Sequence, residues 1–246
     1  MKRRLFLASS ISSALAACSP IGTALNNNAG FHNLLGAAQG LNHAIIGTHG
    51  LAKEYRERDV SAVFPIDSLP TPTDSTYATL VRDDFRNYKL VVDGAVERRS
   101  VFPIARLEQM CNTTQITRHD CVEGWSVVAK WSGIRLGSIL DLVQPRSDAR
   151  YAVFHCMDRD DQGMPYYESL DLHQAHHPQA ILAMRMNDQP IAPDHGAPVR
   201  LKVPTQLGYK SAKWIRRIEV VGSYANLYGG GGGYWEDQGY EWYAGI

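Results

Sequence analysis

The chain has 246 residues, 44% of them hydrophobic and 20% charged, which is an ordinary globular composition with room for one large domain or two small ones. Its 25 basic and 25 acidic residues balance, so the charge gives no indication of nucleic-acid binding. Three of the basic residues lie within the first 17 positions, which contain no acid, so the remainder of the chain is mildly acidic.

The N-terminus has the features of an export signal. Lys2, Arg3 and Arg4 precede an apolar run over residues 5–17, which is shorter than the roughly 20 residues that cross a bilayer as a helix. The run Arg3-Arg4-Leu5-Phe6-Leu7 is similar to a twin-arginine signal, a route that carries proteins already folded. The sequence therefore predicts a signal peptide over residues 1–17 and a periplasmic location.

Cys18 follows Leu15-Ala16-Ala17, which resembles a lipoprotein cleavage box. Two interpretations stay open at this point. Either Cys18 is the acylated first residue of a lipoprotein, or the signal is simply cleaved and Cys18 is incidental. One acyl chain alone anchors a protein only weakly.

The first segments after the signal are a tether and a helix. Residues 18–30 include three consecutive asparagines and are expected to form a polar tether. From Phe31 to about Leu51 the apolar residues recur at helical spacing, which predicts an amphipathic helical segment within 31–58 that covers the domain. The basic residues needed to bind anionic lipid are absent from this stretch.

Residues 59–221 are expected to form the main domain. A proline-rich loop over 61–75 comes first, and the Asp93-Gly94 pair predicts a turn between two strands. The remaining expected elements are a strand at 88–92, a helix at 136–143 ended by Pro145, a strand at 151–154, a helix at 170–176 opened by Ser169 or Asp171 and halted before Pro178, and strands at 199–203 and 214–221. Short strands mixed with short helices, without a βαβ rhythm or an internal repeat, indicate an α+β fold.

Residues 222–246 form a tail rich in glycine and aromatic residues. The run Gly229–Gly233 could suggest a phosphate-binding loop, but no Lys-Ser or Lys-Thr pair follows it and no strand-to-helix junction surrounds it. We therefore expect a flexible crossing that lets the aromatic tail lie on the domain.

The segment Arg118-His-Asp-Cys121-Val-Glu-Gly-Trp125 contains a candidate metal ligand. Thiolates bind metals, and nearby Arg118 and His119 favour the thiolate of Cys121 while Asp120 opposes it. A lone cysteine cannot hold zinc, which takes four ligands, but it could complete the coordination of a metal already chelated by the sulfurs of a cofactor. The alternatives are that Cys121 is a small buried apolar residue and that Arg118 forms a surface salt bridge.

Two later segments suggest a phosphate site. His195-Gly-Ala-Pro-Val-Arg200 ends in a guanidinium, and Gly208-Tyr-Lys-Ser-Ala-Lys-Trp214 combines lysines with small residues. Arginine binds phosphate through two hydrogen bonds, and backbone N–H groups can cradle it. Considered without the motif, basic residues alternating along a strand are more typical of a solvated face.

Three histidines offer a different interpretation. His173, His176 and His177 share one side of a predicted helix and could form a zinc face. No acidic residue or cysteine is near them, and Pro178 ends the helix, so polar helix-end residues are the competing interpretation. An exported zinc protein stays open as one alternative function.

Taken together, and in this order, the three segments around Cys121, Arg200 and Lys213 resemble the molybdopterin-binding domain of the sulfite oxidase family. The closest likeness is to its small exported branch, which includes periplasmic methionine sulfoxide reductases, and it covers about residues 60–221. The resemblance implies an α+β sulfite-oxidase-like domain of mixed sheets and short helices. Larger sulfite oxidases carry an additional dimerisation domain, for which this chain has no room, and this implies a monomer.

The resemblance also implies a cofactor and the residues that hold it. Cys121 would be the protein ligand of molybdenum beside one pterin dithiolene, and Arg118 would lie near the site as a catalytic residue. The expected cofactor-binding residues are Cys156, His195, Arg200, Ser211, Ala212 and Lys213. Relatives place a small hydroxyl residue where Cys156 stands, and Asp67 lies on a loop that supplies polar contacts. With Cys18 lipidated and Cys121 on the metal, Cys111 and Cys156 are left for a disulfide, whose geometry the sequence does not decide.

The activity implied by the resemblance is oxygen-atom transfer at molybdenum. Reduction of a small-molecule or protein-bound sulfoxide is the favoured direction, and sulfite oxidation at the same site is the alternative. The chain has no haem-attachment motif and no membrane span of its own, so we expect a separate cytochrome as redox partner, for example a membrane-embedded b-type cytochrome. An exported binding module that keeps the fold without the cofactor stays open as well.

Overall fold

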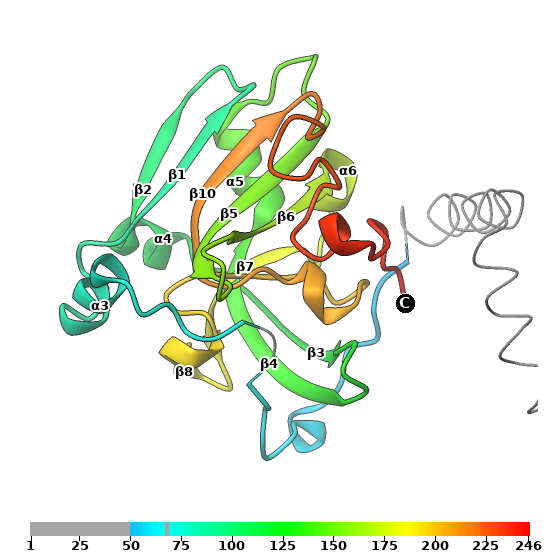
Figure 1. The fold of residues 1–246 in the computed structure, drawn as a ribbon. Helices are drawn as coiled ribbons and strands as arrows, with labels where there is room; N and C mark the ends of the chain where they lie inside the picture. Colours follow the sequence, from blue (N-terminus) through cyan, green and yellow to red (C-terminus); the bar gives the residue numbers. More distant parts are fainter. Residues whose placement is uncertain (1–49, 67–68) are drawn as a thin grey trace, which may run out of the picture. The chain divides into compact units, whose positions relative to one another are not determined.

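The computed structural model describes residues 50–66 and 69–246 (Figure 1). The predicted signal peptide, the tether, Cys18, Asp67 and most of the amphipathic segment lie outside these residues. Among the described residues, no helix has both the length and the apolar character that a membrane crossing requires.

Two β-sheets, one mixed and one antiparallel, form the framework (Figure 1). The first sheet has the strand order β2-β1-β10-β5-β6, and only β1 and β10 run parallel. Its strands are β1 (Lys89–Gly94), β2 (Ser100–Pro103), β5 (Tyr151–Arg159), β6 (Pro165–Asp171) and β10 (Ile215–Val221). The second sheet has the order β3-β4-β7-β8, with β9 also paired to β7. Its strands are β3 (Thr113–Asp120), β4 (Ser126–Arg135), β7 (Ile181–Met186), β8 (Gln189–Pro190) and β9 (Arg200–Lys202).

The helices are short and lie between the strands. The α-helices of the described residues are α3 (Ser75–Arg82), α4 (Ile104–Met110), α5 (Leu136–Val143) and α6 (Leu172–Ala175). Single 3₁₀ turns occur at η1 (Glu57–Asp59), η2 (Pro193–His195), η3 (Gly208–Lys210) and η4 (Glu236–Gln238). Helix α3 begins at Asp74 because its carboxylate accepts hydrogen bonds from the first N–H groups of the helix.

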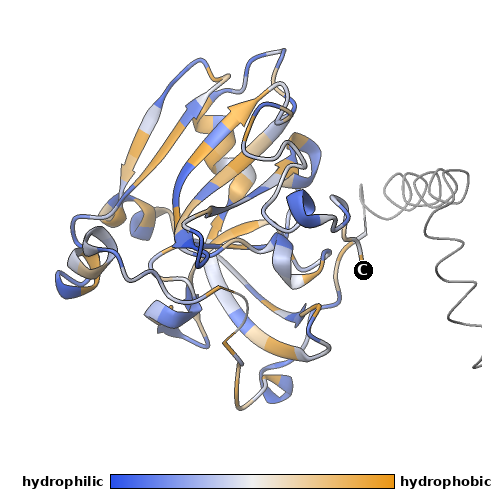
Figure 2. Cartoon of the chain, viewed as in Figure 1, coloured by the Kyte–Doolittle hydropathy of each residue, from blue (hydrophilic) through white to orange (hydrophobic). Residues whose placement is uncertain are grey.

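The main core lies on the first sheet and under α5. Leu90 of β1, Phe154 of β5 and Ile218 of β10 are fully buried in it, and Figure 2 shows the hydrophobic residues that follow these strands and α5. Burying each such side chain stabilises the fold by about 1.5–3 kcal/mol. A smaller cluster of buried side chains around Trp131 packs on the second sheet.

Several sequence predictions are confirmed. The apolar spacing of residues 136–143 forms α5, whose inner face is buried. The helix ends at Gln144, which has a φ of 56°, one residue before the expected Pro145. The predicted helix over 170–176 is shorter, because Leu170 belongs to β6 and the Asp171 carboxylate caps the helix by accepting from the Gln174 N–H.

Other predictions are wrong. Asp93 and Gly94 do not form the turn, because both are paired with β10. A Cβ at Gly94 would lie 2.2 Å from the carbonyl oxygen of Val220, so glycine here permits close strand approach and does not mark a reversal. The sequence patterns also did not indicate the long strand β3, because its buried positions, Gln115, Thr117 and His119, are polar.

The described end of the segment 31–58 is not helical. Its backbone is extended and bonded to the domain: Tyr55 N–H donates to Ile116 of β3 at 2.9 Å, and Ala52 exchanges hydrogen bonds with the Gln179 side chain. These bonds take the backbone groups that a helix would use internally, so the prediction fails between residues 50 and 56.

The possible Cys111–Cys156 disulfide is also wrong. Cys156 is 2% exposed within β5, whereas Cys111 follows α4 and lines a hollow on another part of the domain. None of the three described cysteines forms a disulfide.

Candidate active site

A pocket brings together residues from five separate segments. Cys121 comes from the β3–β4 turn, Ser211 and Lys213 follow η3, and Trp235 belongs to the C-terminal tail. The other lining residues are Val122, Glu123, Asp158, Tyr166, Gly208 and Tyr209. Three of the predicted site residues, Cys121, Ser211 and Lys213, therefore share one pocket although up to 92 positions separate them in the chain.

The turn between β3 and β4 holds the thiol of Cys121. The Cys121 N–H donates to the Trp125 carbonyl at 2.9 Å, and the Gly124 N–H donates to the Cys121 carbonyl at 3.1 Å. Gly124 has a φ of 90°, a conformation that favours glycine. The side chain of Cys121 is half-buried. This exposure suits a thiolate that binds a metal and still leaves room for a substrate.

The structure does not bring Arg118 into this pocket. On β3 its neighbours Thr117 and His119 point inward and are buried, so strand alternation turns Arg118 outward. Its guanidinium is 52% exposed and forms a salt bridge with Asp120 at 2.8 Å. The structure therefore shows Arg118 in the surface salt bridge considered as the alternative, and it does not bring this side chain to Cys121.

Two buried cations, Arg200 and Lys202, belong to β9 and do not line the Cys121 pocket. Arg200 is fully buried and donates to the carbonyl of His195 at 2.9 Å and to that of Ser211 at 3.5 Å. Lys202, 1% exposed, donates to the Arg118 carbonyl at 2.9 Å. Burial of charged groups is costly unless anions, carbonyls or aromatic faces compensate it. The solvated face considered for this strand is therefore wrong, because both basic side chains of β9 point into the protein.

Gly196 lets two of these cationic residues approach each other. It has a φ of +103°, and a Cβ at this position would lie 2.9 Å from Cβ of Lys213 and 3.2 Å from Cβ of Arg200. Any other residue would push the two stems apart. The glycine of the His-Gly-Ala-Pro-Val-Arg motif therefore lets Arg200 and Lys213 pack together, and these two residues with the backbone around Ser211 are here called the cationic cradle.

His195 and Ala212 contribute to this cradle mainly through their backbones. The His195 carbonyl accepts from Arg200, and its half-buried ring lies 5.4 Å from that of Phe64. The Ala212 carbonyl accepts from the Leu201 N–H at 2.7 Å, which fixes the loop after η3 to β9. Neither side chain lines the Cys121 pocket.

Asp158 is a site residue that the sequence reasoning missed. It lines the pocket, is 1% exposed, and its Oδ1 atom has no hydrogen-bond partner among the described residues. Burial raises the pKa of this carboxyl to about 7, against the opposing effect of the Lys213 charge. A buried oxygen without a partner, in a residue that lines a pocket, suits a ligand that carries N–H donors, and a pterin ring carries several. Together with the thiol and the cradle, this oxygen shows that the donor set fits a phosphorylated pterin with a thiolate-ligated metal.

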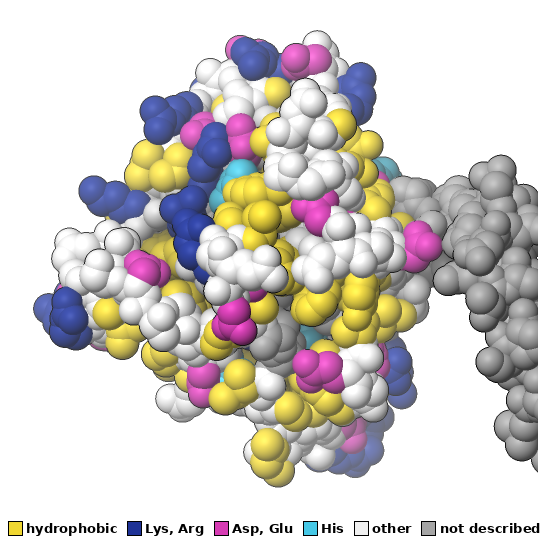
Figure 3. All heavy atoms as spheres, in the orientation of Figure 1, with side chains coloured by type: hydrophobic (Ala, Val, Ile, Leu, Met, Phe, Trp, Pro, Cys, Tyr) yellow, Lys and Arg dark blue, Asp and Glu magenta, His cyan; other side chains and the backbone are white. Residues whose placement is uncertain are grey.

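Cys156 lies outside the Cys121 pocket. It is paired with Ile215 and lines a separate hollow with Tyr88, Met157 and the basic residues Lys89, Arg159 and Arg216. Figure 3 shows Lys and Arg side chains gathered over the part of the molecule that carries β1, β2 and β10. Burial raises the pKa of the Cys156 thiol well above its usual value, so it is a protonated, packed group.

The histidine cluster does not form a metal site. The ring of His176 bonds to the Leu172 carbonyl and faces Asp141, whereas the buried ring of His177 bonds to Gly50 and Gln179. Among the described residues there is no group of three potential metal ligands. The structure therefore does not support the zinc interpretation: backbone groups bond to both ring nitrogens of His177 and to one of His176, whose other ring nitrogen faces Asp141.

The Cys121 thiol, the buried cations and the unsatisfied oxygen of Asp158 are groups that fit a phosphorylated pterin with its metal. The comparisons agree with such a cofactor. Residues 77–228 match the family described as the oxidoreductase molybdopterin binding domain, and the chain belongs to that family. The predicted family, the α+β fold, the enzyme class and the molybdenum–molybdopterin cofactor are confirmed.

Two relatives are similar over much of the chain. The putative protein-methionine-sulfoxide reductase subunit YedZ1 of Azospira oryzae is 34% identical over 91% of this chain and 80% of its own length. The protein-methionine-sulfoxide reductase catalytic subunit MsrP of Campylobacter jejuni is 31% identical over 61% of this chain, and the match spans about half (54%) of that relative.

One solved structure shows the same fold. The sulfane dehydrogenase SoxCD from Paracoccus pantotrophus aligns with a TM-score of 0.50 and 20% sequence identity, covering 56% of this chain and 39% of that chain. At this identity the likeness concerns the arrangement of the sheets and carries no information on the substrate.

Proposed function

We propose that this protein is an exported molybdopterin-dependent reductase that converts a sulfoxide into a thioether. The observation that carries the proposal is the pocket in which the Cys121 thiol meets Ser211 and Lys213. The two relatives described as methionine-sulfoxide reductase subunits support sulfoxide reduction over sulfite oxidation.

The proposal gives the residues of the site the following roles. Cys121 would supply the thiolate ligand of molybdenum, and Asp158 would accept hydrogen bonds from the pterin. Arg200, Lys213 and the backbone around Ser211 would bind the phosphate, and His195 and Ala212 would hold the cradle in shape. When bound, the molybdenum centre supplies the two-electron oxygen-atom transfer itself. The overall reaction consumes one sulfoxide, two electrons and two protons and releases one thioether and one water.

Two electrons must reach the site one at a time, so the proposal includes a separate redox partner. Both relatives are described as subunits, which supports a separate partner chain, and we infer a cytochrome in the membrane for that role. Export to the periplasm, with or without a lipid on Cys18, belongs to the same proposal and rests on the N-terminal sequence.

The test is an assay on protein purified from a molybdenum-replete host. We expect about one molybdenum per chain, oxidation of reduced viologen with methionine sulfoxide, and little reduction of an acceptor dye with sulfite. The Cys121→Ala variant should keep its circular dichroism spectrum and lose turnover. Full turnover in that variant would refute the ligand assignment, and dye reduction with sulfite alone would reverse the proposed direction.

A further inference from the structure

The C-terminal tail, residues 222–246, provides part of the wall of the proposed active site. Trp235 lines the same pocket as Cys121, although 114 positions separate them in the chain. The Trp235 ring lies 5.3 Å from that of Tyr234 and 5.2 Å from that of Tyr240. With Tyr166 and Tyr209, it gives the pocket an aromatic side.

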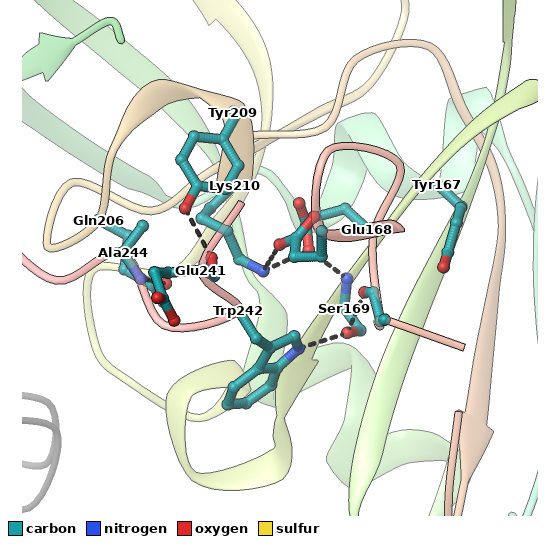
Figure 4. Close-up of polar contacts among 12 residues, drawn as sticks. Tyr167, Glu168, Ser169, Gln206, Tyr209, Lys210, Glu241, Trp242 and Ala244 are labelled. Atoms are coloured by element: carbon teal, nitrogen blue, oxygen red, sulfur yellow. Dashed lines mark hydrogen bonds and ion pairs between the residues drawn. The ribbon is translucent and has the colours of Figure 1, made fainter. Parts of the chain in front are cut away.

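A buried ion triad fixes this wall in place (Figure 4). The Lys210 ammonium forms ion pairs with Glu168 of β6 and, at 2.5 Å, with Glu236 of the tail, and all three side chains are at most 1% exposed. Glu236 directly follows Trp235, and Lys210 directly precedes Ser211. The triad therefore sets the position of the Trp235 ring relative to the loop that would bind the phosphate.

Additional hydrogen bonds hold the rest of the tail against β6 and η3. Tyr209 donates to the Glu241 carbonyl at 2.7 Å, and the Trp242 indole donates to Ser169 at 2.8 Å (Figure 4). The Asp237 carboxylate accepts from the N–H groups of Gly229 and Gly231, which closes the glycine run into a turn. The tail is thus bonded along its length and presents Trp235 in one orientation.

The chemistry of this wall selects for a particular substrate. Aromatic rings contact polarisable sulfur favourably, by about 0.3–1.5 kcal/mol per contact. If Lys213 binds the cofactor phosphate, the remaining charged lining groups are the acids Glu123 and Asp158, which disfavour an anion such as sulfite. A neutral methyl sulfoxide, with an apolar methyl and a sulfur beside the indole, fits this lining better.

We propose that Trp235 is a specificity-determining residue that binds the methylsulfinyl end of a methionine sulfoxide side chain. This inference rests on the proposed function. In this inference the tail binds the substrate as well as packing against the fold.

The test compares Trp235→Leu, which keeps apolar volume, with Trp235→Phe, which keeps an aromatic ring. The matched control is Tyr228→Leu, because Tyr228 is an aromatic residue of the same tail that is 41% exposed and does not line the pocket. For each variant we would measure molybdenum per chain, kcat and KM for methionine sulfoxide, and the Kd of methionine sulfoxide by calorimetry on the oxidised enzyme.

We expect Trp235→Leu to raise KM and Kd by about tenfold with unchanged molybdenum, since about 1.4 kcal/mol corresponds to a factor of ten. Trp235→Phe should recover most of this loss, and Tyr228→Leu should match the wild type. Unchanged KM and Kd in Trp235→Leu, or loss of its molybdenum, would overturn the inference. A wild-type enzyme that binds but does not reduce sulfoxides would refute the proposed reaction and leave the binding role of Trp235 to be decided by calorimetry.

Discussion

Removal of the Lys210 ammonium should destabilise the protein more than any surface charge change. Lys210→Met leaves Glu168 and Glu236 in a site where the side chains are 0% and 1% exposed. Breaking a buried ion pair by removing one partner costs about 3–5 kcal/mol. For a domain of this size, each kcal/mol lowers Tm by roughly 2–4 °C, so the expected decrease is about 6–20 °C.

Lys130→Met is the matched control, because Lys130 also bridges two carboxylates. Its partners are Glu57 at 2.7 Å and Asp188 at 3.0 Å, but these are 66% and 64% exposed. Solvent screens such pairs, so Tm should change little. Differential scanning calorimetry on both variants, side by side, measures the contrast.

The pH dependence gives a second check on the same prediction. Burial, together with the charge of Glu236, raises the pKa of Glu168 well above its usual value, with Lys210 opposing the shift. A raised carboxyl pKa in the folded state means that stability decreases as pH rises and the proton is lost. The decrease in Tm caused by Lys210→Met should therefore be smaller at acid pH, where the carboxyls are neutral. An equal Tm loss in the two lysine variants, or a deficit that grows on acidification, would refute the reasoning.

Three further predictions concern the site. Gly196→Ala should lower the molybdenum content measured by mass spectrometry, because its Cβ would crowd Lys213 and Arg200, whereas Gly163→Ala, also at positive φ but with open space around it, should not. Arg200→Ala should lower molybdenum occupancy, and full occupancy would count against the cradle. In cofactor-free protein, urea unfolding should show stability falling as pH rises from about 4 through 7, because the pKa of Asp158 is raised to about 7. Asp158→Asn should remove this slope, and an unchanged slope would assign it to another group.

The sequence predicted the structure correctly where a single periodicity or a single motif determines it. Leu136, Ile139, Leu140 and Val143 recur at helical spacing, and they form the buried face of α5. Cys121, Ser211 and Lys213 were predicted from their motifs, and the fold brings them into one pocket. Such residues could be found because their local sequence carries the signal.

The failures have physical reasons. The family resemblance implies that Arg118 lies near the site, but alternation along β3 turns its side chain to solvent. The neighbouring Thr117 and His119 are the buried residues of this part of the strand. Asp158 and Trp235 reach the pocket only through tertiary packing of β5 and the tail. No local pattern indicates which carboxylate loses its hydrogen-bond partners or which aromatic ring a distant ion triad positions.

The central claim is that the sulfur of Cys121 completes the coordination of the molybdenum, and X-ray absorption at the molybdenum edge tests it most directly. Wild-type protein and Cys121→Ser should be compared at matched molybdenum content. We expect the variant to lose one sulfur neighbour and gain a lighter one in its place. Identical sulfur coordination in the two proteins would contradict the assignment of Cys121 as the metal ligand.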